Sequence, residues 1–532
     1  MVGANGYLPD VHISGYSGNS SLLLLLARRS LAAVWRVEVL FTGIVAVYLL
    51  SLAVNSVMNK GAFSPDSTVY INMAQNMSEG KGLSSSVEQL NRGMGGIGKL
   101  PTPVTIYAPA YPILITLLTK FGLSAEVASL TIPVVFLGLL LLSAFWMMSV
   151  VMPSYRAAGL VVVAGLIQFA PLRTATMYAW SETMGLAFMI AALFLLLVPR
   201  STRGRELLMP VLAGLVIGLA YASRYALLPL VVVAPLFLIE SSCWKTVRNW
   251  VLCGGASLLI GGPIVVRNLI VSGSIRGGTS VSQVTLQQAV SDLFDTLVSL
   301  SGPPMVLILL LLTIALAITR EIKKKEWRLI KRQGLLLVWT LIYTVFLVYA
   351  ATQTRIDPID FRLTLPATVV LVVLVGAFVA KALPYRAVII LALALVLVPA
   401  WNQWSEASNL VKITGGRDMH SRSLGSGVLP WLADNVDQDD LVIIEGYSDL
   451  PFLLGRPVLT LYFNEGDIGQ ASDLASYLTI NDNNKSETYL VIGSSTSLPN
   501  QFLLQLALVG EFSDGKIFRL VADQVILAQE VE

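Results

Sequence analysis

The stretch VASLTIPVVFLGLLLLSAFWMMSV, residues 127–150, contains no charged side chain. As an α-helix it is long enough to cross the ~30 Å hydrocarbon core of a bilayer. Apolar runs of this kind recur along the chain down to Trp401. The pattern predicts an α-helical protein that crosses the membrane many times.

Eleven membrane spans are expected. The shortest of them would need a locally thin bilayer or polar ends that reach the interface. The expected spans are 37–57, 127–150, 157–172, 181–198, 207–223, 226–240, 250–266, 304–319, 334–351, 363–380 and 386–401.

The overall composition agrees with this fold class. Of 532 residues, 55% are hydrophobic and 13% are charged, whereas a soluble protein has roughly a quarter charged residues. The formal net charge of +3 hides a division, because residues 1–401 carry +14 and residues 402–532 carry −11. The composition excludes an ordinary soluble enzyme and indicates two physically different domains.

Lysine and arginine placement predicts the orientation. A cytoplasmic N-terminus puts 18 of the 29 basic residues before position 402 on the inside, in agreement with the positive-inside rule. Residues 1–36 are then a cytoplasmic tail, and 37–401 form a transmembrane domain with a large first extracytoplasmic loop, 58–126. An odd number of spans leaves residues 402–532 outside. The expected location is the plasma (inner) membrane.

Residues 402–532 alternate strand-like runs with polar or helical stretches. The runs LVIIEG (441–446) and YLVIGSS (489–495) are typical of buried strands, and LPWLADNV (429–436) is typical of a helix. We expect a small extracytoplasmic α/β domain. The long first loop should contain helices of its own, in PDSTVYINMAQNM and YAPAYPILITLLTKFG, with a Gly-rich stretch (93–98) between them.

Several kinds of site are excluded by residue counts. Two histidines and two cysteines rule out a histidine-rich metal site, a histidine-based triad and a disulfide framework. The phosphate-binding pattern GxxxxGK[ST] is absent, which argues against a transporter driven by nucleotide triphosphates. No feature indicates nucleic acid as a partner.

Asp66 follows the first span in FSPDSTVYINMA and has two interpretations. As a structural residue it would lie in the first turn of a helix capped by Ser64, where a carboxylate favours the helix dipole. As a catalytic residue it would lie just above the bilayer and accept a proton as a general base. The residues alone leave both open.

Glu182, in MYAWSETMGLAF, begins the fourth span at its outer end. A buried carboxylate there is costly unless it is paired or solvated. The structural alternative is capping of the helix by Ser181 and Glu182. A functional role is favoured because the helix has no other charge until Arg200.

Four arginines stand alone at outer helix ends, against the topological bias. A guanidinium is well suited to hold a phosphate in a poorly hydrated site. A single such arginine is explained by a long side chain that reaches the membrane interface. Four together favour binding of an anionic lipid headgroup. They are Arg173, Arg224, Arg267 and Arg362.

Aromatic residues near the same surface form mainly an interfacial belt. A minority of them would stack on a sugar ring. The belt comprises Tyr70, Tyr107, Tyr111, Trp180, Tyr221 and Tyr225, of which we expect Tyr70, Tyr107, Tyr111 and Tyr225 to contact a sugar or an acceptor.

At these residues the chain resembles the GT-C superfamily of polytopic membrane glycosyltransferases, in particular bacterial proteins of the family 39 type, which includes protein mannosyltransferases and aminoarabinose transferases. The order and sidedness of the motifs match nearly the whole chain. The motifs are SPDSTVYINMAQNMSEGKG, IYAPAYPILITLL, AWSETMGLAF, GLAYASRYALLPLVV, GGPIVVRNLIVSGSIRG, DFRLTLPATVVL and WLADNVDQDDLVIIEGYSDLPFLLGRPVL.

The resemblance implies roles for these residues. Asp66 corresponds to the catalytic carboxylate and Glu182 to the second acidic position, and the arginines of SRYALLP, VVRN and DFRL would face a lipid phosphate. Ser67 replaces the second acid of the mannosyltransferase Asp-Glu pair, and the Asp-X-Asp arrangement of oligosaccharyltransferases is missing. These departures argue against a bound divalent metal, and no cofactor is expected.

The expected reaction is transfer of a sugar from a polyprenyl phosphate to a hydroxyl of a glycan, lipid or protein, with inversion. Membrane lipids are further partners. The Gly-rich stretch would gate the acceptor. Two alternatives remain: a lipid or polysaccharide transporter, which predicts ionisable residues along the middles of several spans, and a non-catalytic partner of a polysaccharide synthase.

Overall fold

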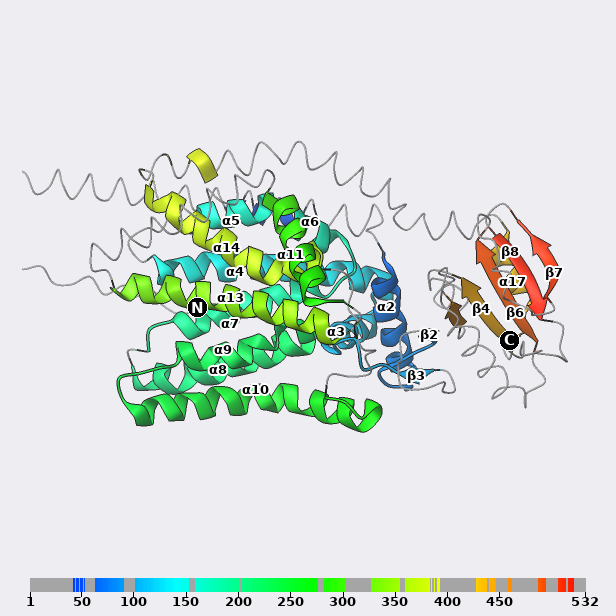
Figure 1. The fold of residues 1–532 in the computed structure, drawn as a ribbon, viewed down its shortest axis with the longest axis horizontal. Helices are drawn as coiled ribbons and strands as arrows, with labels where there is room; N and C mark the ends of the chain where they lie inside the picture. The colour runs from blue at the N-terminus through cyan, green and yellow to red at the C-terminus, as the bar shows by residue number, and fades with distance from the viewer. Residues whose placement is uncertain are drawn as a thin grey trace, which may run out of the picture. The chain divides into compact units, whose positions relative to one another are not determined.

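The computed structural model describes a helical bundle and a mixed β-sheet (Figure 1). Single positions between 42 and 52, at 282, and between 384 and 392 are also described. The continuous ranges are 63–89, 101–152, 158–200, 202–275, 284–301, 327–354, 359–382, 427–437, 440–445, 458–461, 487–493, 506–512 and 515–520.

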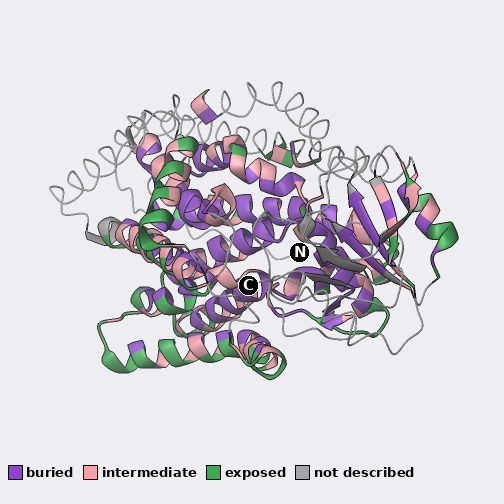
Figure 2. Ribbon diagram, turned by 45° about the vertical axis from the view of Figure 1, so that its right-hand side comes forward, coloured by how far each residue is buried: buried purple, intermediate pink, exposed green. Residues whose placement is uncertain are grey.

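The bundle consists of long apolar helices that pack side by side. Helix α8 packs against α7 and α10, α4 packs against α7, and α14 packs against α5 and α13. Helix α10 exposes large apolar side chains such as Leu258 and Ile270, as expected for a helix that faces lipid. Figure 2 shows how buried and exposed residues are distributed over the helices. The helices are α4 (Ala125–Val151), α5 (Ala158–Gln168), α6 (Ala170–Met177), α7 (Glu182–Leu197), α8 (Arg203–Ser223), α9 (Pro229–Phe237), α10 (Cys243–Ser272), α11 (Leu286–Ser301), α13 (Trp327–Gln353) and α14 (Phe361–Ala382).

Five of the described helices are long and apolar enough to span a membrane: α4, α8, α10, α13 and α14. They coincide with five of the predicted spans. Helix α7 has 16 residues and is about 24 Å long, shorter than the bilayer core. The predicted span 304–319 lies outside the described residues, as do most of 37–57 and of 386–401. The count of eleven therefore stays a prediction.

The predicted span 157–172 is not one straight helix. It divides into α5 and α6, which meet at Phe169 with a bend of 62°. Phe169 has an extended backbone, so the carbonyls at the end of α5 lose their helical partners. The apolar pattern runs through the break, which explains why the sequence reads as one span.

The first loop contains both expected helices, α2 (Pro65–Ser78) and α3 (Ala110–Lys120), at one end of the bundle (Figure 1). Between them, β1 (Ser84–Ser85) pairs antiparallel with β3 (Thr102–Pro103). Buried Asn72 accepts a hydrogen bond from the Ser86 backbone at 2.7 Å and so fastens this segment to α2. The Gly-rich stretch 93–98 is outside the described residues.

Helices α8 and α10 approach closely through two glycines. A Cβ atom on Gly214 would lie 2.1 Å from the Cys253 carbonyl oxygen, and one on Gly218 would lie 2.9 Å from that of Ser257. Both distances are far below van der Waals contact. The small residues therefore let the two backbones touch, as in many membrane helix pairs.

Strands β4 (Leu441–Glu445) and β6 (Thr488–Gly493) occupy the two predicted strand segments. They belong to a six-stranded sheet with β2 (Val87–Gln89), β5 (Val458–Leu461), β7 (Leu506–Glu511) and β8 (Gly515–Leu520). The strand order is β2-β5-β4-β6-β8-β7. Helix α17 (Val428–Asn435) buries Leu432 against the sheet. The edge strand β2 (Val87–Gln89) comes from the first loop and runs parallel to β5, which the sequence did not indicate.

Candidate functional site

Asp66 lies in the first turn of α2, where the sequence placed it. Ser64 and Ser67 form a reciprocal capping pair, and Pro65 occupies the first turn. The structural interpretation of Asp66, a first-turn carboxylate in a helix capped by Ser64, therefore agrees with the structure. The Asp66 carboxylate accepts hydrogen bonds from the Tyr107 hydroxyl (2.9 Å) and from Arg362 Nη2 (2.6 Å). Its side chain is 22% exposed, so it is accessible from one side.

Glu182 is the first residue of α7, and its side chain is only 2% exposed. Ser181 makes no side-chain capping bond, and its hydroxyl instead contacts the Tyr70 hydroxyl at 3.0 Å. The Glu182 carboxylate is paired with two guanidiniums, Arg224 at 2.5 Å and Arg362 at 2.9 Å. The capping interpretation is thus wrong, and the buried charge is compensated by ion pairs.

Arg362, near the start of α14, joins the two carboxylates. Its Nε donates to Glu182 and its Nη2 donates to Asp66. The same guanidinium lies 4.0 Å from the centre of the Trp180 ring, a cation–π contact. Arg362 and Glu182 are 180 positions apart along the chain. Trp180 and Ser64, whose side chains also form a hydrogen bond, are 116 positions apart. These contacts bring distant parts of the chain into one cluster.

Trp180 is a component that the sequence analysis assigned to the interfacial belt. Its ring is buried, its Nε1 donates to the Ser64 hydroxyl at 2.6 Å, and it stacks on Tyr178. It thus connects the cap of α2, which carries Asp66, to Arg362. In the sequence, only its neighbour Glu182 indicated that Trp180 belongs to the site, because a lone tryptophan at a helix end is ordinary in membrane proteins.

Arg224 follows the last residue of α8, and its stem lies against Gly185 of α7. A Cβ on Gly185 would be 3.3 Å from Arg224 Cγ and Cδ, which is a tight contact. The glycine therefore makes room for the arginine to reach Glu182. Helices α7, α8 and α14 each supply one member of this buried ion-pair cluster.

A second network begins at Arg267 and Asn268 in α10. Arg267 Nη2 donates to the Leu83 carbonyl at 2.9 Å. Buried Asn268 donates to the Tyr225 hydroxyl, which in turn donates to the Tyr107 carbonyl. The Tyr107 hydroxyl contacts Asp66, so the two networks meet at this tyrosine.

The predicted arginines differ in their partners. Arg224 and Arg362 pair with Glu182 and Asp66, which makes a cluster of two positive and two negative charges. Among the residues that the structure describes, no carboxylate lies within ion-pair distance of Arg267. Among the described residues, Arg267 thus differs from Arg224 and Arg362 in having no carboxylate partner.

Arg173 has a different position. Its Nη1 donates to the carbonyls of Gln168 (2.6 Å) and Ile167 (3.4 Å) at the end of α5. These carbonyls lose their helical partners at the bend between α5 and α6. These two hydrogen bonds of Arg173 thus stabilise the bend between α5 and α6.

The four predicted tyrosine contacts also separate. Tyr111 is completely buried, and its hydroxyl donates to the Ser129 carbonyl, so it belongs to the core. Tyr70 packs edge-on against Tyr107 and Tyr111. Burial raises the pKa of Tyr70, and the nearby carboxylates of Glu182 and Asp66 raise it further. Tyr107 and Tyr225 are only half-buried and remain candidates to contact a ligand.

In the described part of the chain, no group of three or more His, Cys, Asp or Glu residues is placed to hold a metal ion. The carboxylates of Asp66 and Glu182 both take guanidinium partners instead.

Structural comparison shows that the chain shares the fold of ArnT. Two structures of ArnT from Cupriavidus metallidurans match it. The one bound to undecaprenyl phosphate has a TM-score of 0.59 at 14% identity, covering 90% of this chain and 98% of ArnT. The apo structure has a TM-score of 0.58 at 14% identity, covering 92% and 98%.

The Archaeoglobus fulgidus oligosaccharyltransferase in complex with Zn and sulfate is a more distant match, with a TM-score of 0.48 and 12% identity over 85% of this chain and 68% of that one. No protein-family model matches the sequence, and no curated protein matches it. The comparisons thus establish the fold of the chain.

Proposed function

We propose that this protein is a membrane glycosyltransferase that moves a sugar from a polyprenyl phosphate to a hydroxyl acceptor. The observation that supports this most is the cluster of Asp66, Arg362, Glu182 and Arg224 at one end of the bundle. The GT-C fold, shared with an ArnT structure that holds undecaprenyl phosphate, agrees with a lipid-phosphate donor.

Asp66 is the proposed general base. An ionised carboxylate has about four acceptor positions, and Tyr107 and Arg362 use two of them. An acceptor hydroxyl can therefore approach the exposed side. As its proton passes to Asp66, its oxygen bonds to the anomeric carbon. The bond from that carbon to the phosphate oxygen breaks, and its electron pair leaves with the lipid phosphate, which gives inversion.

Arg267 is the proposed main ligand of the departing phosphate. Its charge has no carboxylate partner among the described residues, whereas those of Arg224 and Arg362 do. A guanidinium directed at the developing charge stabilises it by charge-assisted hydrogen bonds. Of the four arginines predicted to bind the lipid phosphate, Arg267 is the one to which we assign the main contact.

Glu182 is proposed to position the arginines. It is too buried to meet an acceptor, and both of its contacts are guanidiniums. By holding Arg362 between two acids it also sets the orientation of Asp66. This favours the orienting role for Glu182 over contact with the acceptor.

The transporter alternative predicts charges along the middles of spans. In α4, α8, α10, α13 and α14, each charged residue lies within the first or last six positions of its helix. Charges at the membrane surfaces favour surface chemistry over passage through the bundle.

The experiment is transfer of a lipid-linked sugar by the purified protein in proteoliposomes. Transfer without another protein would exclude the non-catalytic partner. Arg267→Ala should raise the donor KM about 10- to 100-fold, the value of one hydrogen bond to a charged group, and leave the acceptor KM unchanged. Arg203→Gln, at an exposed position of α8, is the control. An unchanged donor KM in Arg267→Ala would contradict the assignment.

A further inference from the structure

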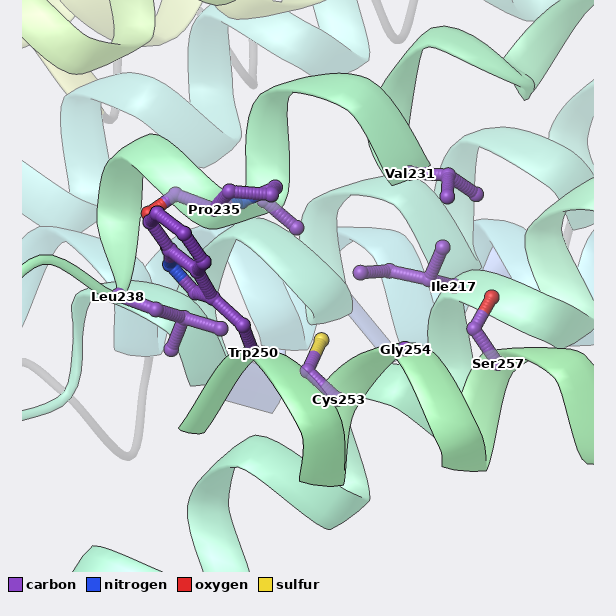
Figure 3. A pocket seen from close by; sticks show the side chains of 9 residues that line it. Ile217, Val231, Pro235, Leu238, Trp250, Cys253, Gly254 and Ser257 are labelled. Atoms are coloured by element: carbon purple, nitrogen blue, oxygen red, sulfur yellow. The ribbon is translucent and has the colours of Figure 1, made fainter. Parts of the chain in front are cut away.

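A second region with binding character lies beside Ile217, in the second half of α8. A shallow groove with a cavity volume of about 40 Å³ opens between α8, α9 and α10, and Figure 3 shows its lining. Ile217, Val231, Leu238 and Trp250 supply apolar walls, and Cys253 and Ser257 lie along one side. The exposed faces of Val231 and Trp250 open it to the membrane.

The lining of the groove suits a hydrocarbon chain. Sites for compact small molecules generally have several polar groups among their lining residues. The Trp250 indole Nε1 is already bound to the Pro235 carbonyl at 3.0 Å, so this wall presents mainly its apolar face. A segment of one acyl chain fits this description.

A basic cluster lies at the end of the groove. Arg200 Nη2 donates to the carbonyl of Phe237, which precedes the lining residue Leu238, and its Nε pairs with Glu240 at 2.9 Å. Lys245 and Arg248 both pair with Glu206. Glu206 is eleven residues before Ile217, which puts both on one face of α8 about 16 Å apart. Three cations thus face two acids.

Two donors of this cluster lack acceptors. Within the described part of the chain, Arg200 Nη1 and Arg248 Nε are buried nitrogens without a hydrogen-bond partner. Buried donors of charged groups are rarely left unpaired, because the loss costs a full desolvation penalty. An anionic group with several oxygens would satisfy them and balance the excess positive charge.

From these observations we propose that the groove and the cluster of Arg200, Lys245 and Arg248 together bind an anionic glycerophospholipid. One acyl chain occupies the groove, and the phosphate contacts Arg200 and Arg248. The cytoplasmic leaflet, where the predicted orientation puts the start of α8, is rich in anionic lipids. The bound lipid would hold α8, α9 and α10 together.

This site is separate from the proposed catalytic one. Arg200 precedes the start of α8, and Arg224 follows its end. The 21 residues of α8 span about 30 Å, one hydrocarbon thickness. A lipid held at Arg200 therefore belongs to the leaflet opposite the one that would present the sugar donor. The proposal does not depend on the transferase assignment.

Native mass spectrometry of the detergent-purified protein tests the headgroup contact. Wild type should retain phosphatidylglycerol in preference to phosphatidylcholine. Arg200→Gln and Arg248→Gln should each weaken retention about tenfold, as expected for a charge-assisted hydrogen bond, whereas Arg203→Gln on the exposed first turn of α8 should not. Equal retention of the two lipids, or an equal loss in Arg203→Gln, would overturn the proposal.

A second measurement remains valid if an arginine variant folds poorly. Brominated acyl chains quench nearby tryptophan, and the Trp250 contribution is the difference between wild type and Trp250→Phe. Brominated phosphatidylglycerol should quench it saturably and more strongly than brominated phosphatidylcholine. Quenching that is equal for both lipids, or that is displaced by polyprenyl phosphate, would show that the groove serves another occupant.

Discussion

Glu182→Gln is the perturbation that best separates a buried ion-pair cluster from an ordinary helix end. Glu182 is 2% exposed and is held by Arg224 at 2.5 Å and Arg362 at 2.9 Å. At an effective dielectric constant of about 20, each pair contributes roughly 4 kcal/mol of attraction at a 4 Å separation of the charges. Desolvation of the three groups offsets much of this.

The variant keeps the side-chain volume but leaves Arg224 without a carboxylate. Arg362 retains Asp66, whereas the Arg224 side chain, 15% exposed, becomes an uncompensated buried charge. Removal of one partner of a buried pair costs about 3–5 kcal/mol. We expect Glu182→Gln to melt several degrees below wild type in detergent, with a correspondingly shorter half-life at elevated temperature.

A second substitution tests whether the uncompensated charge of Arg224 causes the loss of stability. Glu182→Gln combined with Arg224→Met removes both charges, and an apolar replacement of a buried pair is often neutral. The double variant should recover most of the lost stability without recovering activity. Glu511→Gln, which breaks an exposed pair with Lys516, is the control and should change stability by about 1 kcal/mol or less. The reasoning is refuted if Glu182→Gln melts with wild type, or if the double variant is no better than the single one.

Two further predictions concern contacts of Trp180 and Gly214. Trp180→Phe keeps a ring beneath Arg362 but removes the bond to Ser64. It should lower stability by about 1 kcal/mol. Ser64→Ala removes both this bond and the cap of α2, so in a double-mutant cycle it should cost less in the Trp180→Phe background than in wild type; strictly additive losses would contradict the contact. Gly214→Ala should cost about 1–3 kcal/mol by thermal unfolding, because its Cβ would overlap the Cys253 carbonyl. Gly255→Ala has open space and should be neutral, so equal effects would argue against close helix contact.

The sequence singled out the charged residues of the proposed site but not their partners. Asp66, Glu182 and the outward arginines were recognisable because charges at the outer ends of apolar helices are costly and few. Their pairing depends on how α7, α8 and α14 pack, since Arg362 contacts a carboxylate 296 residues away. No local pattern encodes such a distance. The partners therefore appear only in the structure.

Other features were missed for equally physical reasons. The bend at Phe169 lies inside a continuous apolar run, and membrane helices tolerate breaks where a side chain such as Arg173 satisfies the freed carbonyls. Strand β2 has three residues, and it is formed by pairing with β5 from a distant part of the chain. Trp180 resembled any interfacial tryptophan until its contacts with Ser64 and Arg362 were visible.

The most direct test of the account is sugar transfer by Asp66→Asn in proteoliposomes that contain a polyprenyl-phosphate-linked sugar. Asparagine keeps the shape of the side chain and can still accept from Tyr107, but it cannot take a proton. The account predicts that kcat falls by about 10²–10⁴-fold, the usual contribution of a general base, while donor binding is retained. Full transfer activity in the purified Asp66→Asn variant would contradict the central claim.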